Sequence, residues 1–312
     1  MNHIPNFPGM MPPPGPPPMM DTSHIQRKWT DLPYATQSPT QKLDIYLPPV
    51  GDGPFPVIAV IHGGAWEIGD KGDVQHLPML HGLDRGYAVV CINYRLSSEA
   101  QFPCQIYDCK AAIRFIRAHA GDYYLDPQRI AAWGGSAGGH LSALVGTSAG
   151  VAELEDPGMG WSDYSSAVDA VVDWYGPCEN FLKMDEELIE SGMGIPDHST
   201  PSSPESHLLG RHIVEVPELV KFASPMTYIT PAAPHFLIQH GRLDPIVPVQ
   251  QSIHFAAALE RIAGKDRVIL EILEDAVHAD IAFETPENVD RVFRFLDSHL
   301  KYTRASVEES NR

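Results

Sequence analysis

The chain has 312 residues, of which 43% are hydrophobic and 20% charged, as in ordinary globular proteins. Its formal net charge of −18 would repel nucleic acids and anionic membranes. No apolar run approaches the roughly 20 residues that a membrane-spanning helix needs. We therefore expect neither a nucleic acid nor a membrane as a partner.

The two ends of the chain differ in composition from its middle. Residues 1–24 are rich in Pro, Gly and Met and lack the basic and apolar segments of a signal peptide. This composition predicts a flexible arm over 1–24, a folded domain over 25–303 and a disordered tail over 304–312.

The four cysteines form no CxxC pair and no metal-ligand cluster. Either Cys104 or Cys109 could reach Cys178 in the fold, and the sequence does not decide whether a disulfide forms. Four free thiols would suit a reducing compartment, so we expect a cytoplasmic location.

Strand and helix patterns alternate along most of the chain. Alternating Leu43, Ile45 and Leu47 predict a half-buried strand over 42–48. Apolar runs predict further strands over 57–61, 87–92, 129–133, 167–174, 236–239 and 268–273. Apolar residues at helical spacing predict helices over 106–119, 137–147, 249–262 and 286–300. The alternation is typical of an α/β fold, with a mostly parallel central sheet and helices on both faces.

Residues 177–224 interrupt this alternation. The segment is too long for a plain connection and mixes prolines with apolar residues. We therefore expect an inserted, partly helical cap over about 177–224.

The sequence Gly134-Gly135-Ser136-Ala137-Gly138-Gly139 follows one predicted strand and opens a predicted helix. It matches G-x-S-x-G, in which a sharp strand-to-helix turn presents a serine nucleophile. The pattern alone is common, but its position between strand and helix makes Ser136 the candidate nucleophile.

A second glycine motif, His62-Gly63-Gly64-Ala65-Trp66, directly follows the predicted strand over 57–61. Such a loop can direct backbone N–H groups at the oxyanion of an acyl-transfer intermediate. The expected donors are the N–H groups of Gly64, Ala65 and Ala137. We expect His62 to order the loop, and Trp66 either to line the substrate pocket or to pack in the core.

A serine hydroxyl needs a base to take its proton. Chain order selects one, since in this arrangement the acid and then the histidine follow the serine on loops after late strands. Asp244 and His278 occupy those two positions. For His240 a structural role is favoured, and Asp275 is the next candidate for the acid.

Other polar residues in predicted elements are interpreted as structural. Asp108, Arg114 and Asp173 are expected to form ion pairs or caps. The sequence contains no pattern for a zinc or calcium site, so we expect no metal and no cofactor.

Several segments together resemble the BD-FAE-type esterases, the bifunctional carbohydrate acyl-esterase and feruloyl-esterase relatives in the hormone-sensitive-lipase clan. The resemblance runs from about Leu43 to Leu300. It rests on HGGAW (62–66), NYRLS (93–97), FP (102–103), DCKAAIRFIR (108–117), LDPQRIAAWGGSAGGHL (125–141), HGRLDPIVP (240–248) and His278.

The resemblance implies an α/β-hydrolase fold and a serine carboxylic ester hydrolase. Ser136 would be the nucleophile, His278 the base and Asp244 the residue that orients His278. The implied substrates are small esters: short-chain acyl, acetylated-carbohydrate or feruloyl esters. The cap would line the pocket, and Met184, Leu188 and Leu209 would either contact an aromatic acyl group or, as we favour, pack in the core. The chain departs from many relatives at Ala65, where a third glycine is usual.

Two other functions remain open at this stage. An amidase, formamidase or peptidase-like hydrolase would use the same three residues. A non-catalytic binding protein could use the same fold, although such proteins commonly lose the serine or the histidine. A homo-oligomer is also possible.

Overall fold

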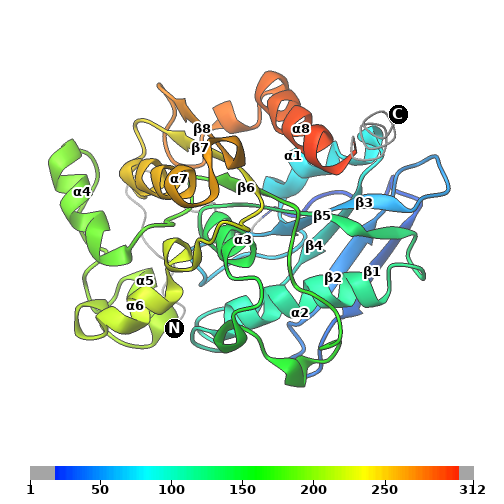
Figure 1. The fold of residues 1–312 in the computed structure, drawn as a ribbon, viewed down its shortest axis with the longest axis horizontal. Helices are drawn as coiled ribbons and strands as arrows, with labels where there is room; N and C mark the ends of the chain where they lie inside the picture. Colours follow the sequence, from blue (N-terminus) through cyan, green and yellow to red (C-terminus); the bar gives the residue numbers. More distant parts are fainter. Residues whose placement is uncertain (1–17, 302–312) are drawn as a thin grey trace.

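The computed structural model describes residues 18–301, which contain a central sheet of eight strands (Figure 1). The order across the sheet is β1-β2-β4-β3-β5-β6-β7-β8, with β2 antiparallel to both of its neighbours and all other pairs parallel. The strands are β1 Lys28–Pro33, β2 Lys42–Tyr46, β3 Phe55–Ile61, β4 Ala88–Ile92, β5 Leu125–Gly135, β6 Ala170–Trp174, β7 His235–Gly241 and β8 Val268–Leu273. The predicted mostly parallel α/β fold is confirmed, while β1 was not predicted.

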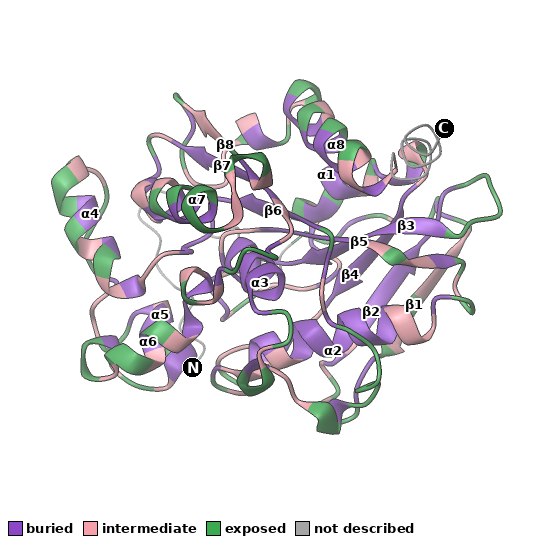
Figure 2. Cartoon of the chain, viewed as in Figure 1, coloured by how far each residue is buried: buried purple, intermediate pink, exposed green. Residues whose placement is uncertain are grey.

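Helices cover both faces of the sheet (Figure 1). They are α1 Leu77–Leu80, α2 Cys104–Ala118, α3 Ala137–Thr147, α4 Met184–Ser191, α5 Pro204–Leu209, α6 Pro217–Ala223, α7 Gln250–Ala263 and α8 Pro286–Leu300. Side chains of α2, α3 and α7 belong to one apolar cluster, and those of α1 and α8 to another. Strand β3 contributes Val57, Ala59 and Ile61 to the first cluster, and Ile58 and Val60 to the second, as the period of two requires. Strands β3, β4 and β6 are accordingly buried on both faces, while the edge strands β1 and β8 are partly exposed (Figure 2).

Strand β2 is more deeply buried than its alternating sequence predicts. Only Lys42 at its start is partly exposed, and Asp44 is 4% exposed. The Asp44 carboxylate pairs with Lys71 at 3.0 Å and accepts a hydrogen bond from the Tyr46 hydroxyl at 3.1 Å. The expectation of a half-buried strand is therefore wrong, because a distant lysine compensates the charge and allows the polar face to be covered.

The end of the predicted flexible arm contacts the folded domain. The Met20 N–H donates to the Gly72 carbonyl at 2.7 Å, and Met19 forms a β-bridge with Asp73. Residues 18–24 thus differ from the expectation of a free arm. Residues 1–17 and the predicted tail over 304–312 lie outside the described residues.

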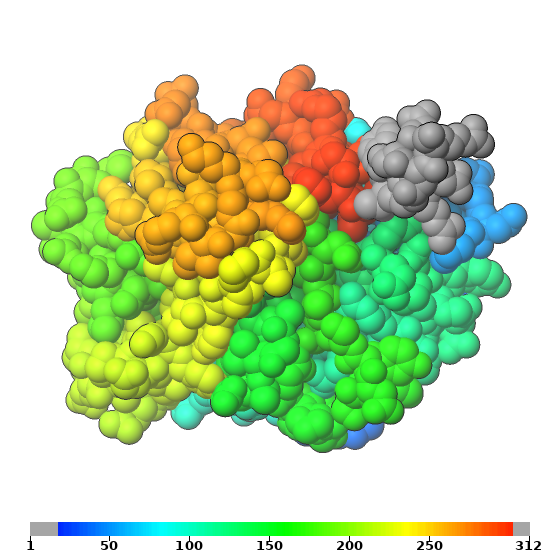
Figure 3. Space-filling view, in the orientation of Figure 1, coloured from blue at the N-terminus to red at the C-terminus, as the bar shows by residue number. Residues whose placement is uncertain are grey.

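Helices α4, α5 and α6 occupy the predicted cap, which begins just after the carboxyl end of β6 (Figure 1). In the space-filling view the yellow-green surface of the cap lies directly against the orange surface of α7 (Figure 3). The cap residues Met184, Leu188 and Leu209 are at most 2% exposed, which favours core packing over contact with an acyl group. Among residues 18–301, no helix has both the length and the apolar character needed to cross a membrane.

A buried ion pair joins α2 to the segment that follows β4. Arg95 donates to both carboxylate oxygens of Asp108, at 2.8 and 2.9 Å, and Gln41 donates to the same carboxylate at 2.7 Å. Arg114, further along α2, pairs with Glu155. These contacts support the structural interpretation of Asp108 and Arg114. Asp173 makes a local turn instead of an ion pair, since it accepts from the Gly176 N–H and the Cys178 thiol.

Replacement of Asp108 by alanine should reduce the free energy of unfolding by about 3–5 kcal/mol, because it leaves Arg95 buried without its partner. Urea denaturation of the two proteins measures the difference. The matched control is Asp163→Ala at an exposed position, which should change stability by less than about 0.5 kcal/mol. Equal stability of the two variants would show that the buried pair does not hold α2.

Candidate active site

Ser136 lies at the turn between β5 and α3, in a backbone conformation that is rare for a residue with a side chain. Its φ is 57° and its ψ −121°, which costs about 1–3 kcal/mol. Two backbone hydrogen bonds hold the turn: the Ser136 N–H donates to the Trp174 carbonyl, and the Ser136 carbonyl accepts from the His140 N–H. The predicted sharp turn is therefore present and is fastened to both β6 and α3.

The start of α3 packs against the end of β3 without room for a side chain between them. A Cβ on Gly138 would lie 2.1 Å from the Ile61 carbonyl oxygen and 2.8 Å from that of His62. A Cβ on Gly63 would lie 2.8 Å from the Gly135 carbonyl oxygen. Glycines therefore bring the serine turn and the loop after β3 into direct backbone contact.

The structure brings Ser136, His278 and Asp244 together in one chain of hydrogen bonds. His278 Nε2 lies 3.0 Å from the Ser136 hydroxyl, and His278 Nδ1 lies 2.7 Å from Asp244 Oδ2. Since a carboxylate can only accept, Nδ1 carries the proton and Nε2 is free to accept the serine proton. The three residues selected from chain order thus have the geometry of a nucleophile, a base and an orienting acid.

The Asp244 carboxylate is fully buried on the loop after β7. Its other oxygen accepts from the N–H groups of Ile246 and Val247, each at 2.9 Å. Burial alone would raise its pKa, but His278 and the hydrogen bonds from His240 and His278 outweigh burial and hold the pKa of Asp244 well below its usual range. Asp244 is therefore ionised at neutral pH and can stabilise a positive charge on His278.

Two further residues at this site were not predicted to contact it. His240 Nε2 lies 3.2 Å from Asp244 Oδ2 and 2.9 Å from the Val247 carbonyl, while its Nδ1 accepts from the Ser252 hydroxyl at 2.7 Å. The ring of Tyr175 meets that of His278 edge-on, with centroids 4.8 Å apart. In the sequence, a place in this site could be inferred only from chain position: His240 lies near the end of β7, and Tyr175 directly follows β6. In contrast, Asp275 is exposed, and the His278 Nδ1 atom is hydrogen-bonded to Asp244.

The loop after β3 contains three consecutive residues in the left-handed region. The φ values are 99° at Gly64, 54° at Ala65 and 57° at Trp66. The N–H groups of Glu67 and Ile68 both donate to the Gly64 carbonyl, which closes the loop on itself. Ala137 is the first residue of α3, so its N–H has no partner within the helix. The role of the Gly64, Ala65 and Ala137 N–H groups as oxyanion donors stays a prediction.

His62 is fully buried at the start of this loop. Its ring stacks on Tyr94 at 4.2 Å between centroids, its Nδ1 lies 2.8 Å from the Gly63 carbonyl, and the Tyr94 hydroxyl donates to the His62 carbonyl. Burial lowers the pKa of His62 to about 4. His62 is therefore neutral at physiological pH, which supports its expected role in ordering the loop.

Trp66 is 2% exposed and packs against His140 and Phe181. Its position fits the alternative in which it packs in the core. A contact between Trp66 and substrate stays a prediction.

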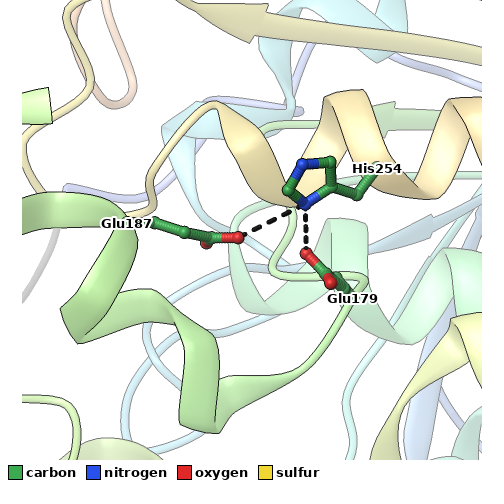
Figure 4. A group of neighbouring side chains, drawn as sticks. All are labelled: Glu179, Glu187 and His254. Atoms are coloured by element: carbon green, nitrogen blue, oxygen red, sulfur yellow. Dashed lines mark hydrogen bonds and ion pairs between the residues drawn. The ribbon is translucent and has the colours of Figure 1, made fainter. Parts of the chain in front are cut away.

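The fold also assembles a group of side chains that the sequence did not predict. Glu179, Glu187 and His254 come from three separate segments, and their ligand atoms lie within 4.8 Å of one another (Figure 4). The sequence contains no metal-site pattern, but the fold brings together one group of possible metal ligands among the described residues.

The sequence matches the BD-FAE family over residues 43–259, and the chain belongs to this family. It is 36% identical over 254 residues to the protein named Esterase LipQ of Mycobacterium tuberculosis, covering 80% of this chain and 56% of that protein. The chain spans about half the length of the first curated relatives that it matches. The resemblance inferred from the motifs is confirmed.

Two solved structures share the fold over most of this chain. One is described as a truncated form of a carbohydrate esterase from gut microbiota, with a TM-score of 0.79, 30% identity and coverage of 90% of this chain and 99% of that chain. The other is described as a bifunctional GH43-CE of Bacteroides eggerthii, with a TM-score of 0.77, 34% identity and coverage of 88% of this chain and 35% of that chain.

The lowered pKa of His62 predicts a contribution to the pH dependence of stability. The folded-state pKa of about 4 lies below the ordinary value of 6.5, so between these values the unfolded chain binds a proton that the folded chain does not. The contribution of neutral His62 to the free energy of unfolding is fully present above pH 6.5 and is lost as the pH falls toward 4. His62→Gln should reduce this slope by up to about 1.4 kcal/mol per pH unit, measured by urea denaturation at several pH values. An unchanged slope in the variant would contradict the assignment.

Proposed function

We propose that this chain is a carboxylic ester hydrolase that acts through an acyl-enzyme on Ser136. The observation that carries the proposal is the chain of hydrogen bonds from Ser136 through His278 to Asp244, beside N–H groups that fit an oxyanion site. The relatives support the proposal, because both a curated protein and a solved structure that the chain resembles are described as esterases. A cytoplasmic location and a homo-oligomer stay predictions.

The first half of the reaction forms the acyl-enzyme. As the Ser136 oxygen attacks the ester carbonyl, His278 Nε2 takes the hydroxyl proton, and the resulting imidazolium is stabilised by ionised Asp244. The carbonyl oxygen becomes an oxyanion that the N–H groups of Gly64, Ala65 and Ala137 can bind. His278 then gives its proton to the departing alcohol as the bond between carbonyl carbon and alkoxy oxygen breaks.

The second half repeats these steps with water. His278 takes a proton from water, whose oxygen attacks the acyl carbon, and then returns a proton to Ser136 as the acid leaves. The tight packing around Asp244 keeps His278 in one orientation through both halves. The reaction needs no group beyond those of the chain and water.

We infer that the substrate is an ester of a small acyl group on a carbohydrate alcohol. The Tyr175 ring limits space beside the nucleophile, since a Cβ on Gly135 would lie 2.9 Å from the Tyr175 hydroxyl, and Tyr175 also contacts the His278 ring. Such packing favours acetyl over longer or aromatic acyl groups. The carbohydrate alcohol is suggested by the description of the solved relative as a carbohydrate esterase.

Removal of any of the three proposed catalytic groups should lower kcat. Ser136→Ala and His278→Ala should each lower kcat by roughly 10⁴- to 10⁶-fold, and Asp244→Asn by less than either. The assay is hydrolysis of p-nitrophenyl acetate, with circular dichroism to show that each variant folds. Full activity of Asp244→Asn would exclude Asp244 as the acid.

A substrate panel separates the esterase from the amidase that would use the same residues. The panel contains p-nitrophenyl esters of acetyl, butyryl, octanoyl and feruloyl groups and the p-nitroanilide of acetic acid. The expected kcat/KM is highest for acetyl, about tenfold or more lower for octanoyl, and lower for the anilide than for the acetyl ester. Preference for the anilide would favour the amidase, and preference for feruloyl would contradict the small acyl site.

A further inference from the structure

Three ionisable side chains meet where the cap contacts α7. Glu179 lies in the segment after β6, Glu187 in cap helix α4 and His254 in α7 (Figure 4). The proposed ester hydrolysis uses none of the three. They are separated along the sequence, so the folded cap is what brings them together.

The three side chains converge on one point. His254 Nδ1 lies 2.6 Å from a Glu179 oxygen and 3.4 Å from Glu187 Oε1, so a single imidazole nitrogen faces both carboxylates. Ligands bound tetrahedrally to Zn²⁺ at about 2.0–2.1 Å lie roughly 3.3 Å apart. One of the two observed distances already matches this spacing. The other requires only a small movement of His254, whose side chain is 50% exposed.

Glu187 gives an independent indication that a ligand belongs here. The residue is 5% exposed, and its Oε1 atom is buried without a hydrogen-bond partner among the described residues. This oxygen is the one directed at His254. A buried carboxylate oxygen that makes no hydrogen bond is costly, and the His254 nitrogen 3.4 Å away compensates its charge only when the ring is protonated. A bound cation would satisfy this oxygen directly.

Gln251 contacts the carboxylate of Glu187 and the backbone of Glu179. Gln251 is fully buried on α7 and donates to the other Glu187 oxygen at 2.8 Å. The side-chain oxygen Oε1 of Gln251 accepts hydrogen bonds from the backbone N–H groups of Glu179 and Asn180 at 3.0 and 3.2 Å. One amide side chain thus orients the Glu187 carboxylate and holds the backbone that carries Glu179; groups around metal sites commonly orient ligands in this way.

We propose that Glu179, Glu187 and His254 form a binding site for a divalent transition-metal ion, with Zn²⁺ as the best-fitting ion. One imidazole and two carboxylates are donors that Zn²⁺ accepts, and the exposed side of His254 leaves a fourth position for water. Ca²⁺ fits less well, because it takes 6–8 oxygen ligands.

The ion would tie the cap to the α/β core. Its three ligands lie on a loop after the sheet, on a cap helix and on a core helix, so binding would cross-link all three. Glu179 also accepts from Ser224 at the end of the cap through its carbonyl oxygen. The ion therefore has a structural role, and its stabilisation of the folded chain grows with the logarithm of its free concentration relative to Kd.

Isothermal titration of the full EDTA-treated chain with Zn²⁺, at a pH of about 8 where the ligands are deprotonated, tests the proposal. We expect one equivalent bound in the wild type, with a rise in Tm. Glu187→Gln and His254→Gln should each weaken binding by more than about 100-fold and abolish the rise in Tm, since each removes a direct ligand. Ca²⁺ should produce neither effect.

Glu190→Gln is the matched control, because Glu190 is exposed on the same helix as Glu187. It should bind Zn²⁺ as the wild type does. His254 is half-exposed, so its variant should fold even if the buried Glu187 variant does not. Zinc held elsewhere, for example at His278, would remain in both ligand variants. Unchanged stoichiometry and affinity in His254→Gln, or no binding by the wild type, would overturn the proposal.

Discussion

The backbone contact between the start of α3 and the end of β3 sets the distance on which the proposed chemistry depends. Gly138 lies so close to the Ile61 carbonyl that any side chain would push the helix away. The same approach holds the strained Ser136 turn against the loop that begins at His62. The proposed nucleophile and the proposed oxyanion donors therefore belong to backbone segments that pack together, and the loops after β7 and β8 supply Asp244 and His278.

Hydrogen bonds also hold the loops after β7 and β8, which carry Asp244 and His278. Asp244 accepts from two backbone N–H groups and from two histidines, so His278 has one orientation available. On the cap side, His198 contacts Glu205 and the Ile246 carbonyl, which joins the cap to the loop that carries Asp244. The cap is thus hydrogen-bonded to the same loop that orients His278 through Asp244. An ion at the Glu179–Glu187–His254 group would add a second connection at α7.

The sequence was sufficient for the parts of the site that follow local rules. Ser136 lies in a glycine motif between a strand and a helix, and Asp244 and His278 follow strands in the order that this arrangement requires. Contacts between distant segments could not be predicted in the same way. Nothing in the sequence around Asp44 indicates that Lys71 would cover it, and Glu179, Glu187 and His254 share no recognisable spacing. Strand β1 was missed because KWTDLP has neither alternation nor an apolar run, and pairing with β2 defines it.

The central claim is that Ser136 becomes covalently acylated, and intact-protein mass spectrometry with a fluorophosphonate tests it most directly. The reagent phosphonylates an activated serine and loses fluoride, so the account predicts one adduct per chain, located by peptide mapping at Ser136. The same adduct should be absent from Ser136→Ala and much slower to form in His278→Ala. A folded wild-type chain that forms no adduct, or forms it at another serine, would contradict the account.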